Sequence, residues 1–461
     1  MQWSKFNQRT GGKRAVIGGC LHRWRAATQV WVVAATVATV SLVGTSLGPR
    51  ARAASATAAD QRQPVTLTWW VVAGDTEDLY QELATTYHKL HPEVSFKIEP
   101  QTSWDSLVQK LLLAAAAGKP PALTQFHNAF TSRLFPVFEP IPESIWPRQA
   151  MQELFWSLEA GSEVNGSIRF TLGGLMTPLL WLNLDRFDEA GLQPNLSTWD
   201  ELRVDARKLT RYAPDGRVQV TGFDGNGPAL WDDLVYQQGQ FMWDEKGTRL
   251  QLNTLAGQRA LTLVYQLQVQ DKSWHPEMEY WNGTFLRNQV GILYEWGFYR
   301  HVVQAQAKFR WTAVRIPTWT GQPKPAVARN NYETDFAVLA AAPTAEKAAA
   351  FRFLRWVYEE SSFPVKRNLA LTRIPSVKRL WTNPAFTEDA VFRATLQTIP
   401  YSIFPGERPA WISEIISEAY QKMRTGTALE NALATAQEKA DARLRREPVF
   451  WIAERRSPAE S

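Results

Sequence analysis

Cysteine is almost absent from this chain of 461 residues, which contains only one. A single thiol excludes a disulfide framework, a zinc ribbon and a CxxC redox site. Hydrophobic residues make up 45% of the chain and charged residues 21%, which excludes general disorder. The length corresponds to about two or three domains of ordinary size.

Acidic residues are absent from residues 1–53, a segment that contains eight Lys and Arg residues. The rest of the chain has 43 basic and 45 acidic residues, so the net charge of +6 comes from this N-terminal segment. The remainder is nearly neutral and lacks the basic excess that is typical of nucleic-acid-binding proteins. We therefore expect no nucleic acid partner.

The N-terminal segment has the order of a secretory signal. A basic stretch is followed by the uncharged residues 26–49 and then by Ala51-Arg52-Ala53, a small-x-small cleavage site. We predict that residues 1–53 are a leader, that residues 54–64 form a flexible stalk, and that the body reaches the periplasm or the outer face of the cytoplasmic membrane. The alternative is an uncleaved membrane anchor.

Known catalytic motifs are also missing. The chain has no HExxH, GxSxG, Walker A or GxGxxG pattern after a strand, and nothing in it calls for a cofactor. His88 and His91 have a spacing that could share a metal, but a surface position at a helix end before Pro92 explains them equally. Paired carboxylates of a glycosidase are defined by their separation in space, so this class of enzyme stays an alternative.

Strand-like and helix-like patterns alternate along the body, which indicates an α/β fold. Strands at 65–72, 94–98 and 122–126 are separated by helices that begin after Asp75 and Ser103. This order favours a parallel sheet with right-handed crossovers. Further helices are predicted over Pro228–Gln240, Thr254–Gln270, Thr344–Glu360, Ala410–Arg424 and Ala428–Arg445, and strands over Val290–Tyr294, Trp311–Ile316 and Phe336–Ala340.

Tryptophan is abundant: the chain has 21, of which 18 follow the predicted leader. Its flat apolar ring with one N–H group suits sugars, because sugar C–H faces stack on the ring. Trp199 and Trp356 lie in helical stripes and are expected in the core. Trp70, Trp231 and Trp296 lie at predicted strand ends or in loops and are candidates for ligand binding.

Several motifs occur in one order along the body. They are Thr68-Trp69-Trp70, His91-Pro92-Glu93-Val94, Gly118-Lys119-Pro120-Pro121, Leu180-Trp181-Leu182-Asn183 through Phe187-Asp188-Glu189-Ala190-Gly191-Leu192, Thr198-Trp199-Asp200-Glu201-Leu202 and Arg373-Ile374-Pro375-Ser376. In these segments the sequence resembles the extracellular solute-binding proteins of ABC importers, in particular the carbohydrate-type family that includes maltose-binding protein. The resemblance runs from about residue 65 to the C-terminus.

The resemblance implies the two-lobe fold of type II periplasmic binding proteins, with discontinuous lobes joined by hinge strands. The first lobe would comprise residues 65–177 and 322–372, and the second would comprise residues 178–321 and 373–455. A ligand would bind in the cleft between them.

Open α/β sheets bind ligands beyond the carboxyl ends of their strands, which places loops 70–78, 126–131 and 295–299 at this cleft. The residues expected to stack on sugar faces are Trp70, Trp231, Trp296, Phe298 and Tyr332. Those expected to hydrogen-bond hydroxyl groups are Asp75, Glu77, His127, Asn128 and Glu295. The sequence departs from the family pattern at Ala122, at Glu295–Phe298 and at Asn330–Thr334.

The resemblance implies a monomeric receptor without catalytic activity, which would deliver a sugar or related polyol to the permease subunits of an ABC importer. Two alternatives are kept. A receptor for a glycerol-phosphate-type solute would use basic residues near the proposed loops, namely Arg133, Arg300 and Arg329. A secreted carbohydrate-active enzyme would need two carboxylates facing each other across the cleft.

Overall fold

The computed structural model describes residues 63–456, apart from 75–76, 279–281, 323–326, 407, 448 and 450–453. The side chains of residues 282 and 332–335 also lie outside the description, as do the predicted leader and most of the predicted stalk. The chain from Arg62 onward is one compact unit. Within the described residues, no helix combines the length and the apolar character that crossing a bilayer requires.

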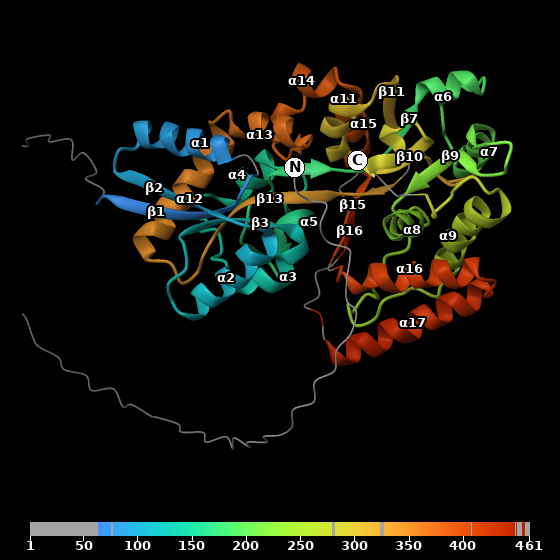
Figure 1. Ribbon diagram of the computed structural model, residues 1–461. Coiled ribbons are helices and arrows are strands. Elements are labelled where there is room, and N and C mark those ends of the chain that lie inside the picture. Colours follow the sequence, from blue (N-terminus) through green and yellow to red (C-terminus); the bar gives the residue numbers. More distant parts are fainter. Residues whose placement is uncertain are drawn as a thin grey trace, which may run out of the picture. The chain divides into compact units, whose positions relative to one another are not determined.

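The first sheet has six strands in the order β14-β6-β13-β3-β1-β2 (Figure 1). They are β1 (Val65–Val72), β2 (Val94–Gln101), β3 (Leu123–His127), β6 (Gly174–Met176), β13 (Asn331–Val338) and β14 (Ile374–Pro375). β1 runs parallel to β2 and β3, whereas β13 is antiparallel to β3 and β6. The predicted β-α-β-α-β order is confirmed by α1 (Glu77–Leu90) and α2 (Trp104–Ala116), and Ser103 caps α2 as expected.

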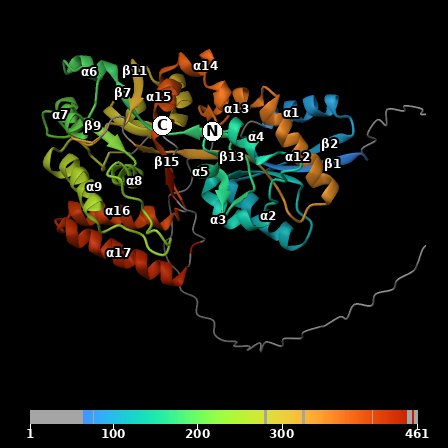
Figure 2. The same ribbon diagram turned by 180° about the vertical axis from the view of Figure 1, so that it is seen from behind.

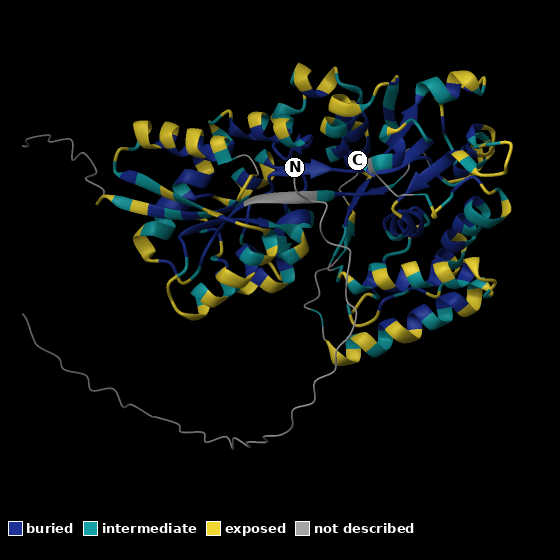
Figure 3. Cartoon of the chain, in the orientation of Figure 1, coloured by how far each residue is buried: buried dark blue, intermediate teal, exposed yellow. Residues whose placement is uncertain are grey.

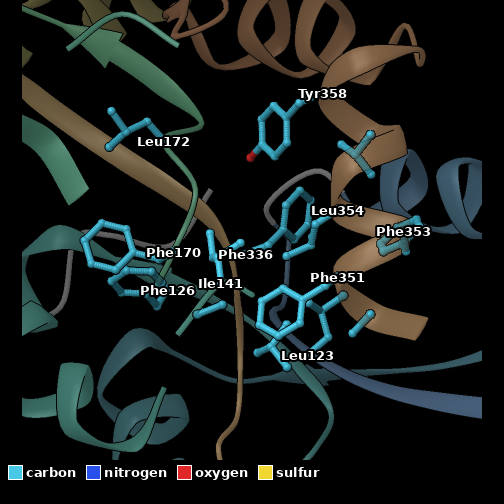
Figure 4. Packing of buried hydrophobic residues seen from close by; sticks show 14 of the residues in the cluster. Leu123, Phe126, Ile141, Phe170, Leu172, Phe336, Phe351, Phe353, Leu354 and Tyr358 are labelled. Atoms are coloured by element: carbon cyan, nitrogen blue, oxygen red, sulfur yellow. The ribbon is translucent and has the colours of Figure 1, made fainter. Parts of the chain in front are cut away.

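The core of this sheet is aromatic. Alternate residues of β1 point into it, and Trp69 is fully buried, with its ring centroid 4.8 Å from that of Tyr80 and 5.1 Å from that of Phe336. Helices α12 (Thr344–Glu359) and α13 (Phe363–Leu371) contribute to the same cluster. Figure 4 shows part of it, with Phe126 beside Phe170.

The second sheet has five strands in the order β11-β7-β10-β9-β8. They are β7 (Pro178–Asn183), β8 (Arg211–Tyr212), β9 (Val218–Gly225), β10 (Val290–Trp296) and β11 (Trp311–Arg315). Side chains of β7 alternate between two hydrophobic clusters: Leu180 and Leu182 belong to one, and Leu179 and Trp181 belong to the other. The sheet is therefore covered on both faces, which agrees with its buried strands in Figure 3.

Helices α7 (Trp199–Leu209), α8 (Gly227–Tyr236), α9 (Leu255–Tyr265), α16 (Trp411–Arg424) and α17 (Leu429–Arg446) contribute to the first of these clusters. α11 (Arg300–Gln306) and α15 (Ala390–Thr398) contribute to the second. Both ribbon views place α16 beside α17 (Figures 1 and 2). The predicted core positions of Trp199 and Trp356 are confirmed.

Short elements complete the described chain. They are α3 (Thr131–Leu134), α4 (Arg148–Leu154), α5 (Leu158–Ser162), α6 (Leu184–Glu189), α10 (Asn282–Leu286), α14 (Pro384–Thr387), β4 (Glu163–Val164), β5 (Ser167–Ile168), β12 (Ala328–Arg329), β15 (Ser402–Phe404) and β16 (Arg455–Arg456), together with single turns η1 (Asn128–Phe130), η2 (Phe135–Val137), η3 (Gln266–Gln270), η4 (Gly297–Tyr299), η5 (Lys378–Leu380) and η6 (Ile399–Tyr401).

The chain passes from the first sheet to the second at Thr177, between β6 and β7. The predicted lobe boundaries stay predictions, but one difference is plain. β14 pairs with β6 of the first sheet, although residues 373–455 are predicted to belong to the second lobe. The reason is that the strand is only Ile374 and Pro375, too short to give a recognisable sequence pattern.

Candidate ligand site

The carboxyl end of β3 brings two predicted residues together. The half-buried imidazole of His127 lies 5.6 Å from the ring of Trp104, centroid to centroid. Its Nδ1 accepts a hydrogen bond of 3.0 Å from the backbone N–H of Ala129. The neutral ring therefore carries its proton on Nε2, which makes His127 a hydrogen-bond donor at that atom.

The neighbouring Asn128 has a carboxamide whose Oδ1 is buried and has no hydrogen-bond partner among the described residues. Its backbone carbonyl is occupied, because it accepts a 2.8 Å hydrogen bond from the hydroxyl of Thr131. A buried acceptor without a donor is unfavourable, so a ligand hydroxyl that reached this oxygen would be stabilising.

Glu77 begins α1, close to the end of β1, and its carboxylate accepts a 3.3 Å hydrogen bond from the backbone N–H of Gly74. Its expected role in binding ligand hydroxyl groups stays a prediction. Asp75, predicted to act beside it, lies outside the described residues.

Trp70 is half-buried in β1, between Glu99 of β2 and Thr124 of β3. Its indole N–H donates a 2.9 Å hydrogen bond to the carboxylate of Glu99. A hydrogen bond from Lys97 lowers the pKa of Glu99, so this acceptor is ionised at neutral pH. The ring is therefore tied to the neighbouring strand, two residues before β1 ends.

Trp231 is fully buried in α8, and its indole N–H donates to the backbone carbonyl of Gly257. A Cβ atom on Gly257 would meet the Trp231 ring at 3.1 Å, so α9 packs closely against it. This position is that of a core residue, which contradicts the predicted stacking role. The burial of Trp231 could not be predicted from the sequence, because almost every residue of α8 is buried and the helix has no polar face that would mark its orientation.

The carboxyl end of β10 groups three further predicted residues. Glu295 is only 3% exposed, and its carboxylate accepts a 2.7 Å hydrogen bond from the backbone N–H of Trp296. Trp296 is half-buried and ends the strand, and Phe298 is half-buried in the turn that follows. Tyr332 pairs with Leu175 through the backbone, and its side chain is outside the description.

A buried charge cluster supports Trp296. The guanidinium carbon of Arg329, in β12, lies 5.2 Å from the centroid of the Trp296 ring. Arg329 donates to Asp233 at 3.1 Å and to Asp232 at 2.8 Å, and both carboxylates lie in α8. A further donor reaches the hydroxyl of Tyr294 at 3.3 Å. Burial alone would lower the pKa of Arg329, but attraction to Asp233, Tyr294 and Asp232 raises it, so the group stays charged.

Sequence reasoning missed most of this cluster. From the sequence, Arg329 is expected only in the phosphate alternative, and Asp232 and Asp233 have no expected role. The signal was present, since Asp232 and Asp233 interrupt an otherwise apolar helix from Leu230 to Tyr236. Two adjacent acids in such a helix require buried partners.

No cluster of three metal-binding side chains occurs within the described part of the chain. The two histidines with metal-like spacing have other contacts: His88 bonds to the backbone carbonyl of Val94 at 2.6 Å, and the ring of His91 lies 4.3 Å from that of Tyr87.

Comparison with known proteins places the chain in a clear context. The sequence profile of the family described as "Bacterial extracellular solute-binding protein" matches residues 73–362. A binding protein of Brucella abortus (strain 2308) is 21% identical over 389 residues, which are 80% of this chain and 91% of that protein.

Solved structures show the same architecture. The cyclic alpha-maltosyl-1,6-maltose binding protein of Arthrobacter globiformis has a TM-score of 0.70 at 18% identity, over 83% of this chain and 100% of that chain. A sugar-binding protein of Xanthomonas citri has a TM-score of 0.69 at 15% identity, over 83% of this chain and 98% of that chain. The predicted fold class, the two-lobe α/β fold of type II periplasmic binding proteins, is thereby confirmed.

Proposed function

This chain belongs to the bacterial extracellular solute-binding proteins, and from that premise we propose that it binds a neutral sugar or related polyol between its two sheets. Delivery of this solute to the permease subunits of an ABC importer is part of the proposal. The names of the structural neighbours, which refer to maltose-type and other sugars, support the ligand class.

The observation that carries the proposal is the setting of Trp296. Arg329 lies over one face of the indole ring and is itself held by two carboxylates, so the orientation of the ring is fixed. In the proposal, the C–H groups of a sugar ring stack on the opposite face. The proposal gives Glu295 and Phe298 supporting positions beside this ring.

The first sheet would supply the polar contacts. In the proposal, the Oδ1 atom of Asn128 accepts from a sugar hydroxyl, and Nε2 of His127 donates to another. Asp75, Glu77 and Tyr332 complete the proposed set. Trp70 would contribute through the edge of a ring that Glu99 already orients. The two lobes would close on the solute. The solute would shift the population toward the closed conformation to the extent that it binds this conformation more tightly than the open one.

The charges near the site favour a neutral ligand over a phosphorylated one. Arg300 donates to Asp389 at 2.9 and 2.7 Å, and Arg329 is neutralised by two buried carboxylates. Of the three arginines considered for phosphate, only Arg133 is exposed. These carboxylates occupy the guanidinium N–H groups that a phosphate would need. The proposal therefore disfavours a receptor for a glycerol-phosphate-type solute.

Calorimetry of residues 54–461 against glucose, maltose, maltotriose and sorbitol tests the proposal. We expect at least one of these to bind, and Trp296→Ala to weaken that binding about tenfold or more through loss of the stacking surface. Trp411→Ala, which removes another half-buried tryptophan from α16, is the matched control and should bind as the parent does.

Binding of glycerol 3-phosphate without any binding of the four neutral compounds would overturn the sugar assignment. Equal affinity of the Trp296→Ala variant would remove the stacking role. Release of nitrophenol from a nitrophenyl glucoside would show turnover and support the enzyme alternative instead.

A further inference from the structure

A cavity of about 480 Å³ lies beside β11, the edge strand of the second sheet. It is walled by β11, by α15 and by the loop at residues 194–197. Its volume is within the range of small-molecule sites in proteins. None of its described lining residues belongs to the proposed sugar site.

The lining of this cavity is positively charged. It contains Arg315 and Arg393, and no Asp or Glu among its described residues. The remaining polar groups include the hydroxyl of Ser197 and the amides of Asn195 and Gln397. Asp389, which caps α15, is paired with Arg300.

The guanidinium of Arg315 is only partly satisfied by the described residues. Its Nη2 atom is buried and has no hydrogen-bond partner in the described part of the chain. Its guanidinium carbon lies 5.8 Å from the centroid of the Tyr401 ring. Burial lowers the pKa of Arg315, because little of its charge is compensated by the protein. An oxyanion in the cavity would supply the missing negative charge.

Arg393 lies on α15, at the other wall. It is exposed, and its Nη1 donates to the carbonyl oxygens of Thr387 and Glu388, both at 3.2 Å. These two hydrogen bonds orient one side of the guanidinium group. The cavity is therefore lined by a half-buried arginine from β11 and by an exposed, oriented arginine from α15.

We propose that this cavity is a binding site for a small oxyanion, the phosphate or carboxylate group of a small solute, with Arg315 as its main ligand. The planar guanidinium matches the geometry of phosphate and carboxylate oxygens. The cavity is larger than a phosphate ion, so the rest of the solute occupies the space along β11 and α15. This site does not depend on the proposed sugar function.

Alanine-methyl NMR of residues 54–461 provides a direct test, because Ala313 and Ala394 both line the cavity. Sodium phosphate and sodium citrate are titrated separately, with sodium chloride at equal ionic strength as the reference. We expect saturable shifts of these methyl signals with at least one oxyanion. Comparing phosphate with citrate decides between the two sources of the oxyanion.

Arg315→Met keeps the apolar stem and removes the charge, so the affinity should fall about tenfold or more. Arg315→Lys keeps the positive charge and should retain part of the affinity for the oxyanion. Arg310→Met removes one exposed charge five residues earlier and should bind as the parent does. The proposal would be overturned if the Arg315→Met variant bound the oxyanion with the affinity of the parent. It would also be overturned if phosphate and citrate shifted the methyl signals no more than chloride does.

Discussion

At the scale of single residues, Glu454 is a half-buried acid with an altered affinity for protons. Its carboxylate accepts hydrogen bonds from the hydroxyl of Tyr236 at 2.5 Å and from the backbone N–H groups of Met242 at 3.1 Å and Trp243 at 2.9 Å. Burial nevertheless raises the pKa of Glu454 to about 7, with a smaller contribution from the charge of Asp232.

The sign of the resulting pH dependence follows from proton binding. The folded protein binds the Glu454 proton more tightly than the unfolded chain does, so this contribution to stability is complete below pH ~4.5 and is lost as the pH rises through about 7. The free energy of unfolding should fall by up to about 3 kcal/mol over this range. Urea denaturation from pH 4.5 to 8 measures it.

Glu454→Gln should lower stability overall and flatten this decline, because the titrating group is gone. Glu438→Gln, an exposed glutamate on α17, should leave the decline unchanged. If the two variants showed the same slope against pH, the decline would have to come from other groups.

Local residue roles were predictable where the interaction is local in sequence. The capping box at the start of α7 is one example, since Thr198 and Glu201 lie only three residues apart and exchange hydrogen bonds. Trp231 shows the opposite case. Whether its ring is buried depends on Gly257 in another helix, and no pattern within α8 reveals that contact.

At the scale of elements, β12 is fastened to α8. Arg329 in β12 bonds to Asp232 and Asp233 in α8, and Asp232 also accepts from Arg408. Because the two carboxylates are fully buried, removing Arg329 leaves Asp233 without its cationic partner. Arg329→Met should therefore cost about 3 kcal/mol or more of stability, measured by urea denaturation.

A control variant and a double variant test whether the loss of stability in Arg329→Met comes from the buried ion pair. Arg217→Met removes an exposed arginine that pairs with an exposed aspartate, so it should change stability little. Asp233→Asn combined with Arg329→Met should recover part of the loss, since the unpaired charge is then removed. A loss below about 1 kcal/mol for Arg329→Met would contradict the role assigned to the ion pair.

Element boundaries were predicted well for amphipathic helices and less well for strands. The helix predicted over 428–445 is found at Leu429–Arg446. The strand predicted over 336–340 is in fact Asn331–Val338, because its polar first half pairs with β6. That pairing joins residues about 155 positions apart, and local periodicity carries no information about it.

At the scale of the whole molecule, export is the prediction to test. Mass spectrometry of the protein secreted by a bacterial host should give a mature chain that begins at Ala54, since the small-x-small pattern ends at Ala53. A control with Ala51→Asp and Ala53→Asp should accumulate the uncleaved form. Recovery of the parent chain from the membrane with residues 1–53 attached would support the anchor alternative.

The position of β13 constrains how the polypeptide acquires its structure during synthesis. This strand lies between β6 and β3, yet it is made of residues 331–338. A nascent chain that has not yet emerged to this point lacks the piece that joins the two halves of its first sheet. The joining of β6 to β3 must therefore wait until about three quarters of the sequence has left the ribosome, which leaves an export machinery time to engage an unfolded chain.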